Sequence, residues 1–224
     1  MNQFQIKLFE GHPIINDGEN IILVDTGAPS TIHITDRLNF CSENYKCYTN
    51  YMGLTVSKIS DMLGTEITTL LGADVLSDYK ILFNYKNELI EFNKQDIAFD
   101  GIQTVISRFM GIPIIELSID SQKMKFFLDT GAKLSYIQDS ITSNYESIGT
   151  FEDFYPGVGI FQTECFEIPT SFENNNFIVK YGNLPTILQM TLIMGGTDGI
   201  IGYDFFKNFK VVLNLEDNIL KYSK

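Results

Sequence analysis

Residues 21–28 of this 224-residue chain have the sequence IILVDTGA, and residues 126–132 repeat the pattern as FFLDTGA. In each copy a short apolar run leads directly into an Asp-Thr-Gly-Ala turn. Apolar runs of this length are typical of buried strands, and glycine lets the backbone turn tightly where a strand ends. A single Asp-Thr-Gly is weak evidence, but two copies inside matching frames predict one structural unit that is used twice.

The matching frame extends well beyond these two motifs. Residues 11–15 match residues 111–115 at an offset of 100, the Asp-Thr-Gly-Ala motifs match at 104, and residues 70–74 match residues 200–204 at 130. The chain therefore has the pattern of a tandem duplication with insertions in the second copy. Two copies are too few for a solenoid, which needs at least about three stacked units, so we expect two similar lobes that face each other.

The repeated pattern resembles that of aspartic peptidases of the retropepsin and pepsin clan, in which Asp-Thr-Gly follows an apolar pair and an apolar-apolar-Gly element comes later in the same half. Ala28 and Ala132 make each motif more similar to the retroviral type than to the pepsin type, where Ser or Thr is usual. The resemblance implies a mostly β, two-lobed aspartic-protease fold, with β-barrel-like lobes at residues 1–99 and 100–224 and few short helices. Retroviral enzymes build their site from two identical chains. This chain resembles both halves joined, so we expect a monomer.

The same resemblance implies an aspartic endopeptidase whose carboxyl pair is Asp25 and Asp129. Two carboxylates held within a few ångströms cannot both ionise, so they share one proton and titrate as a unit. The ionised carboxylate can activate a water, and the protonated one can donate to the oxygen of a peptide carbonyl. This chemistry requires no metal and no cofactor, and the expected substrate is an extended polypeptide.

The other motif residues are expected to support the pair and the substrate backbone: Thr26, Gly27, Ala28, Thr130, Gly131 and Ala132. By resemblance, the two threonine hydroxyls bond across between the loops, and the two glycines let substrate backbone approach closely. A non-catalytic module that holds a peptide in the same cleft is the alternative. Both aspartates and both threonines are intact, which favours the enzyme.

The second copy is longer than the first between its two motifs. From Asp25 to Gly72 the chain advances 47 residues, and from Asp129 to Gly202 it advances 73, an excess of 26. In the family this interval carries the flap, a hairpin that closes over the substrate. Residues 151–161, FEDFYPGVGIF, have apolar arms around a tip where glycine permits positive φ. We assign the flap to Tyr155, Pro156, Gly157, Val158, Gly159 and Ile160, in the second lobe rather than in the first, where pepsin-like enzymes carry it.

The composition excludes some partners. The formal net charge is −12, and the 16 Lys and Arg residues are scattered, which argues against nucleic-acid binding. No apolar run approaches the length of a membrane span, and residues 1–7 lack the pattern of a signal peptide. Three cysteines suit a reducing compartment, so we expect a cytoplasmic protein, and a local bridge between Cys41 and Cys47 is the less favoured alternative.

Other residues that could carry chemistry stand alone in the sequence. His12 and His33 are far apart and lack the companions that a metal site or a catalytic triad needs. Cys165 has no histidine near it in sequence and fits a buried thiol. Residues 195–199, GGTDG, lack the lysine of a phosphate-binding loop and fit a turn that leads into the last apolar-apolar-Gly element.

The pattern of the remaining sequence predicts mostly strands. Residues 4–9 alternate as one strand, and hairpins are expected around residues 16–18 and 120–122. Three short helices are expected, at residues 57–63 with a cap at Ser57 and a stop at Gly64, at 73–79 and at 203–209.

Overall fold

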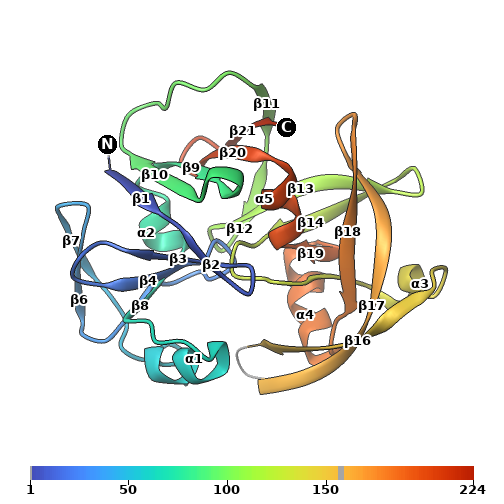
Figure 1. Ribbon diagram of the computed structural model, residues 1–224, viewed down its shortest axis with the longest axis horizontal. Helices are drawn as coiled ribbons and strands as arrows, with labels where there is room; N and C mark the ends of the chain where they lie inside the picture. The colour runs from blue at the N-terminus through green and yellow to red at the C-terminus, as the bar shows by residue number, and fades with distance from the viewer. Residues whose placement is uncertain (1, 156–158) are drawn as a thin grey trace.

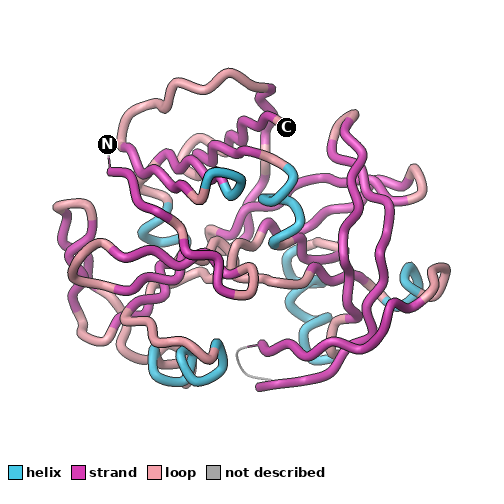
Figure 2. The backbone as a smooth tube through the Cα atoms, viewed as in Figure 1, coloured by secondary structure: helices cyan, strands magenta, loops and turns pink. Residues whose placement is uncertain are grey.

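The structure is a computed structural model that describes residues 2–155 and 159–224 of the chain. The described part is mostly β, with short helices at its periphery and between its sheets (Figures 1 and 2). This confirms the mostly β class expected from the sequence. Four sheets of six, eight, five and two strands account for the strands.

The six-stranded sheet takes strands from both ends of the chain (Figure 1). In spatial order its strands are β1 (Asn2–Gln5), β10 (Leu89–Asn93), β9 (Lys80–Asn84), β20 (Lys210–Asn214), β21 (Ile219–Ser223) and β11 (Ile102–Val105). At its centre, β9 and β20 pair antiparallel, with Leu82 opposite Val212. These two residues are equivalent at the offset of 130, so the centre of the sheet pairs a residue with its own counterpart. A local twofold arrangement requires such a pairing.

The five-stranded sheet and the eight-stranded sheet share one strand order. The first contains β2 (Lys7–Phe9), β3 (His12–Asn16), β4 (Ile21–Val24), β8 (Thr69–Leu71) and β5 (Ile32–His33). The second begins with β12 (Ser107–Phe109), β13 (Ile112–Ile119), β14 (Gln122–Leu128), β19 (Gly199–Ile201) and β15 (Ser135–Ile137). In both sheets the strand that precedes an Asp-Thr-Gly runs parallel to the strand of the apolar-apolar-Gly element.

Three further strands extend the eight-stranded sheet beyond this shared order. They are β18 (Asn175–Asn183), β17 (Gly159–Phe172) and β16 (Ser147–Tyr155). An additional pairing joins β17 back to β13, so six strands of this sheet form a closed circuit. The fourth sheet is the hairpin of β6 (Arg37–Phe40) and β7 (Glu43–Lys46).

The chain changes sheets at Ile6 and again at Ile106. The expected single strand over residues 4–9 is therefore wrong, because β1 pairs in the six-stranded sheet and β2 in the five-stranded one. The N–H of Ile6 donates to the carbonyl of Glu88 over 2.8 Å, and the N–H of Ile106 donates to that of Asn218 over 2.9 Å. Both isoleucines are buried at the point where the strand bends.

The first helix, α1 (Val56–Leu63), begins one residue earlier than the sequence predicts, and Thr55 rather than Ser57 caps it. The hydroxyl of Thr55 accepts from the N–H of Lys58, and Gly64 ends the helix in the left-handed conformation, as expected. The other helices are α2 (Ala73–Leu76), α3 (Asp139–Thr142), α4 (Thr186–Gly195) and α5 (Tyr203–Asn208), with a 3-10 turn η1 (Tyr85–Asn87).

Helix α4 was not predicted, although its position follows from the repeat. It leads into β19 as α1 leads into β8, and the offset of 130 carries residues 57–63 onto 187–193. The segment 195–199 is thus not only a turn: Gly195 is the last residue of α4, Gly196 is its left-handed cap, and Gly199 is the first residue of β19.

Two-residue turns with positive φ connect several hairpins. Asp120 and Ser121 have φ of 49° and 65°, and they join β13 to β14. The expected loop over 120–122 is therefore one residue shorter, since β14 begins at Gln122. Glu10 and Gly11, with φ of 49° and 93°, connect β2 to β3 in the same way.

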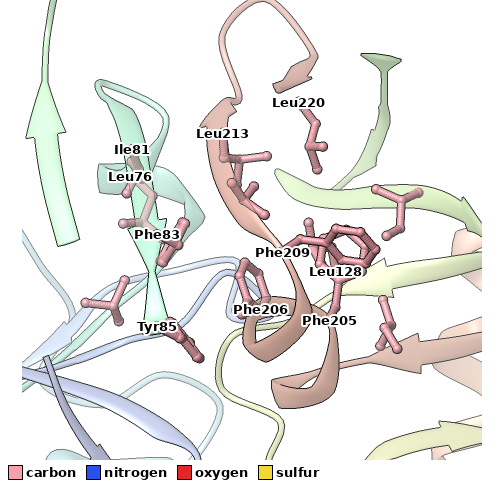
Figure 3. Packing of buried hydrophobic residues seen from close by; sticks show 14 of the residues in the cluster. Leu76, Ile81, Phe83, Tyr85, Leu128, Phe205, Phe206, Phe209, Leu213 and Leu220 are labelled. Carbon is pink, nitrogen blue, oxygen red and sulfur yellow. The ribbon is translucent and has the colours of Figure 1, made fainter. Parts of the chain in front are cut away.

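The largest apolar core lies beneath the six-stranded sheet and contains residues from both halves of the chain. Figure 3 shows Phe205 and Phe209 close to Leu128, and Phe206 between this group and Phe83 of β9. Leu213 of β20 pairs with Ile81 of β9. Smaller clusters lie under each of the other two large sheets. The strands that carry the Asp-Thr-Gly motifs are thus held from both sides by apolar packing.

Candidate active site

Each Asp-Thr-Gly turn follows a strand at the middle of its sheet. Asp25 follows β4, and its N–H donates to the carbonyl of Leu71 over 3.0 Å. Asp129 follows β14, and its N–H donates to the carbonyl of Ile201 over 3.0 Å. In each half, the parallel neighbouring strand, β8 or β19, therefore holds the aspartate at the same point of its turn. The structure brings the two turns together between the halves.

Buried threonines connect the two turns. The N–H of Thr26 donates to Oγ1 of Thr130 over 2.9 Å, and the N–H of Thr130 donates to Oγ1 of Thr26 over the same distance. Each hydroxyl in turn donates over 2.7 Å to a carbonyl of the opposite strand, that of Leu128 or Val24. Both side chains are inaccessible to solvent. Four reciprocal hydrogen bonds thus fix the turns relative to each other.

The glycines of the motifs leave space for the opposite carboxyl group. A Cβ on Gly27 would lie 2.2 Å from Cγ of Asp129, and a Cβ on Gly131 would lie 2.6 Å from Cγ of Asp25. No side chain fits at such distances. Glycine is therefore required at both positions, because each carboxyl group packs against the backbone of the other turn.

The two carboxyl groups lie close enough to perturb each other's titration. Burial raises the pKa of Asp25, while hydrogen bonds from Asp129 and from the backbone N–H groups of Gly27 and Ala28 lower it. Burial raises the pKa of Asp129 well above its usual range, and the charge of Asp25 adds to this shift. Two carboxyl groups coupled in this way lose their protons in separate steps, so the pair can hold one proton between them.

Backbone contacts support the turns from below. The carbonyl of Ala28 accepts from the N–H of Ala73 over 2.8 Å, and the carbonyl of Ala132 accepts from the N–H of Tyr203 over 2.9 Å. A Cβ on Gly202 would lie 2.1 Å from the Ala132 carbonyl oxygen, which explains the glycine of the apolar-apolar-Gly element.

The pair lies at the floor of a cleft of about 960 Å³ that both halves line. The first half contributes one wall with the apolar residues Leu23, Ile32 and Leu70, and its Lys58 and Asp61 also line the cleft. The equivalent positions of the second half are Phe127, Tyr136 and Ile200, and this wall also contains Lys133 and Asp153. Equivalent positions therefore line both sides of the cleft, and the aliphatic Leu23 and Ile32 of the first half correspond to the aromatic Phe127 and Tyr136 of the second.

The hairpin of β16 and β17 extends from the second half over this cleft. Side chains alternate along β16, so Phe154 packs against the apolar cluster of the first half, while Phe151 and Tyr155 pack against that of the second. Burial and the charges of Asp129 and Asp25 raise the pKa of Tyr155 to about 12. This hairpin is therefore in contact with both walls.

The structure describes only part of the expected flap tip. Tyr155 and Gly159 both line the cleft, and Gly159 has a φ of 85°. Ile160 is 62% exposed. Pro156, Gly157 and Val158 lie outside the described residues.

None of the isolated candidates His12, His33 and Cys165 lines the cleft. His33 is buried and its ring nitrogen contacts the carbonyl of Thr68 and the hydroxyl of Thr69. All three cysteines are free thiols, and burial raises the pKa of Cys165 to about 11. Across residues 2–155 and 159–224, no three His, Cys, Asp or Glu side chains gather as they would around a metal ion. The same ranges contain no helix long and apolar enough to cross a membrane.

Three polar residues that line the cleft were not among the site residues predicted from the sequence: Lys133, Tyr136 and Asp153. One signal was available, because Lys133 follows the second motif where Pro29 follows the first. Asp153 lies in the insertion and has no counterpart that could have been compared. His12, which sequence reasoning set aside, packs on Phe154 with ring centroids 5.8 Å apart.

Comparisons with known proteins do not identify the chain. No family model matches it, and no curated protein matches it. Among solved structures it resembles the foamy viral protease-reverse transcriptase in complex with an RNA/DNA hybrid, at 12% identity and a TM-score of 0.32. That likeness covers 41% of this chain and 11% of the other. A likeness this weak does not assign the fold.

Proposed function

We propose that the chain is a single-chain aspartic endopeptidase with the two-lobed retropepsin/pepsin-like fold, its lobes at residues 1–99 and 100–224. The observation that carries this proposal is the carboxyl pair. Asp25 and Asp129 lie in equivalent turns that the crossed threonines hold together, perturb each other's titration and line the same cleft. Structural ion pairs also perturb pKa values, but a like-charged pair at the floor of a cleft is typical of a catalytic site.

In the proposed reaction the pair supplies both the base and the acid. The ionised carboxylate, assigned to Asp25, takes a proton from a water as that water attacks the carbonyl carbon of a peptide bond. The protonated carboxyl of Asp129 donates to the carbonyl oxygen, which gives a neutral tetrahedral intermediate. Asp25 then gives its proton to the amide nitrogen while Asp129 takes a proton from a hydroxyl of the intermediate. The C–N bond breaks as the new carboxyl group forms, and the pair again holds one proton.

The cleft supports an extended polypeptide as the substrate. A strand-like substrate can pass between the walls with alternate side chains in opposite pockets, and its backbone can approach the motif glycines. The hairpin of β16 and β17 would serve as the flap, since it contacts both walls. We propose that the enzyme acts as a monomer, because one chain contains both carboxyl groups.

Replacing each aspartate separately tests the proposal. Asp25→Asn and Asp129→Asn should each reduce cleavage of an unfolded protein at least about a thousandfold, since neither variant can supply both roles. Circular dichroism and thermal unfolding should show that both variants remain folded. If either variant keeps near wild-type activity, the assignment is wrong. If the wild type binds peptides in the cleft but cleaves none, the non-catalytic module is the correct reading.

A further inference from the structure

Lys133 occupies a position where the two halves of the chain differ. It directly follows Asp129-Thr130-Gly131-Ala132, whereas Pro29 follows the first motif. Its side chain is 20% exposed, which is low for a lysine. The second Asp-Thr-Gly turn thus carries a largely buried cation that the first turn lacks.

The ammonium group of Lys133 contacts two carboxylates from different parts of the fold. Nζ lies 3.3 Å from Oε2 of Glu10, in the turn between β2 and β3 of the first half. It also lies 3.7 Å from Oδ1 of Asp153, in β16. One side chain therefore bridges the first half, the Asp129 turn and the hairpin over the cleft.

Asp153, at one end of the bridge, is buried and accepts two further hydrogen bonds. It is 5% exposed, its Oδ1 accepts from the N–H of Phe154 over 2.8 Å, and its Oδ2 accepts from the hydroxyl of Tyr136 in β15. Hydrogen bonds to neutral groups do not supply a countercharge, so a carboxylate buried this deeply depends on the lysine for it. Its position is two residues before Tyr155, where the described part of β16 ends.

A second contact joins the same three segments without charge. The ring of His12, in β3, packs on Phe154 beside Asp153 and lies against the backbone of Gly131. The hairpin therefore meets the first half through the ionic bridge and through Phe154, which packs on His12 and on the apolar cluster of the first half. Of these two contacts, removing the bridge would leave the packing of Phe154 to hold the hairpin against the first half.

We propose that Lys133 is a positioning residue that sets the hairpin of β16 and β17 over the cleft by bridging Glu10 and Asp153. Lys133 does not take part in the bond-breaking step. It acts by holding the hairpin where a bound polypeptide would contact it. Only this effect on substrate binding rests on the proposed function. The bridge between the Asp129 turn and the hairpin is argued from the contacts of Lys133 alone.

Hydrogen exchange measured on the whole chain tests the link directly. Lys133→Met keeps the length of the side chain and removes its charge, while Lys133→Arg keeps the charge. Lys123→Met is a control with the same substitution, since Lys123 pairs with Glu116 over 2.6 Å at an exposed position and does not line the cleft. In Lys133→Met, the amides of residues 147–155 and 159–172 should exchange about tenfold faster, with the other sheets unchanged. Lys133→Arg and Lys123→Met should match the wild type.

Steady-state kinetics on a peptide substrate tests the effect on binding. Lys133→Met should raise KM about tenfold with kcat within about threefold, because the hairpin contacts substrate and transition state alike. Arginine should restore KM. The proposal is overturned if Lys133→Met leaves exchange in the hairpin unchanged, accelerates it equally in all sheets, or is not rescued by arginine. If the wild type cleaves no peptide, the proposed function is wrong. The exchange comparison then still tests whether Lys133 positions the hairpin.

Discussion

At the scale of single residues, the candidate site depends on side chains and glycines whose hydrogen bonds and close contacts require the residue that is present. Thr26 and Thr130 are fully buried, and each uses its hydroxyl both as an acceptor and as a donor. Gly27 and Gly131 are required because a carboxyl group occupies the space of a side chain. These positions follow from the sequence motif, since the chemistry of Asp-Thr-Gly specifies them.

Replacing Thr26 by valine should destabilise the protein and misplace the turns. Valine has the shape of threonine but leaves the N–H of Thr130 and the carbonyl of Leu128 without their partner. Two buried unpaired groups should lower the free energy of unfolding by about 2–4 kcal/mol in urea titrations. Thr26→Ser keeps the hydroxyl and should lose less than half as much. Equal losses in the two variants would show that the methyl group, not the hydrogen bonds, supplies the stability.

The alanines after each motif should set the acidic limit of activity. Ala28 and Ala132 have no side-chain donor, so no hydrogen bond from these two side chains lowers the pKa of either carboxyl group against the effect of burial. Activity needs one ionised carboxylate, and a raised pKa delays its ionisation to higher pH. We expect an optimum at mildly acidic pH, higher than for a pepsin-like enzyme. Replacing both alanines by serine should move the acidic limb of the pH–rate profile downward, and an unshifted limb would contradict this.

At the scale of elements, the sequence predicted the strands and turns of the repeated frame better than the inserted segment. The strands before each motif, the hairpin around residues 16–18 and the stop of α1 at Gly64 follow from local patterns. The hairpin arms β16 and β17 and the long strand β18 pair with each other over many residues, and periodicity alone does not specify such partners. Helix α4 is apolar on most sides, so it lacked the periodic polar face that signals a helix.

The contact between β3 and β16 should make stability depend on pH through His12. Burial lowers the pKa of His12 to about 4 from an ordinary value of 6.5. The unfolded chain therefore binds a proton between pH 6.5 and 4 that the folded chain does not, so stability falls as the pH falls through this window. The contribution of His12 to this loss is about 3 kcal/mol.

Replacing His12 by isoleucine, the residue at the equivalent position 112, should remove this contribution. The loss of unfolding free energy between pH 6.5 and 4 should be about 3 kcal/mol smaller in the variant than in the wild type. Urea titrations at both pH values measure it, and a titration at pH 7.5 controls for the change in packing. A wild-type pH dependence that persists in the variant would show that His12 is not buried in its neutral form.

At the scale of the whole molecule, the two halves are joined by a shared sheet as well as by the crossed threonines. The six-stranded sheet pairs β9 with β20 about a centre where Leu82 faces its own counterpart, Val212. The largest core also draws on both halves. The offsets in the sequence predicted that the halves would correspond. They could not predict this pairing, because the register between distant strands is fixed by tertiary packing.

The central claim is that one chain supplies both carboxyl groups of one site, and a mixing experiment tests it most directly. Cleavage of an unfolded protein is measured for the wild type, for Asp25→Asn, for Asp129→Asn and for an equal mixture of the two variants. The account predicts full activity that is proportional to concentration for the wild type, and none for either variant or for their mixture. Activity restored in the mixture would show that the site forms between two chains, and activity in either variant alone would show that the pair is not the catalytic group.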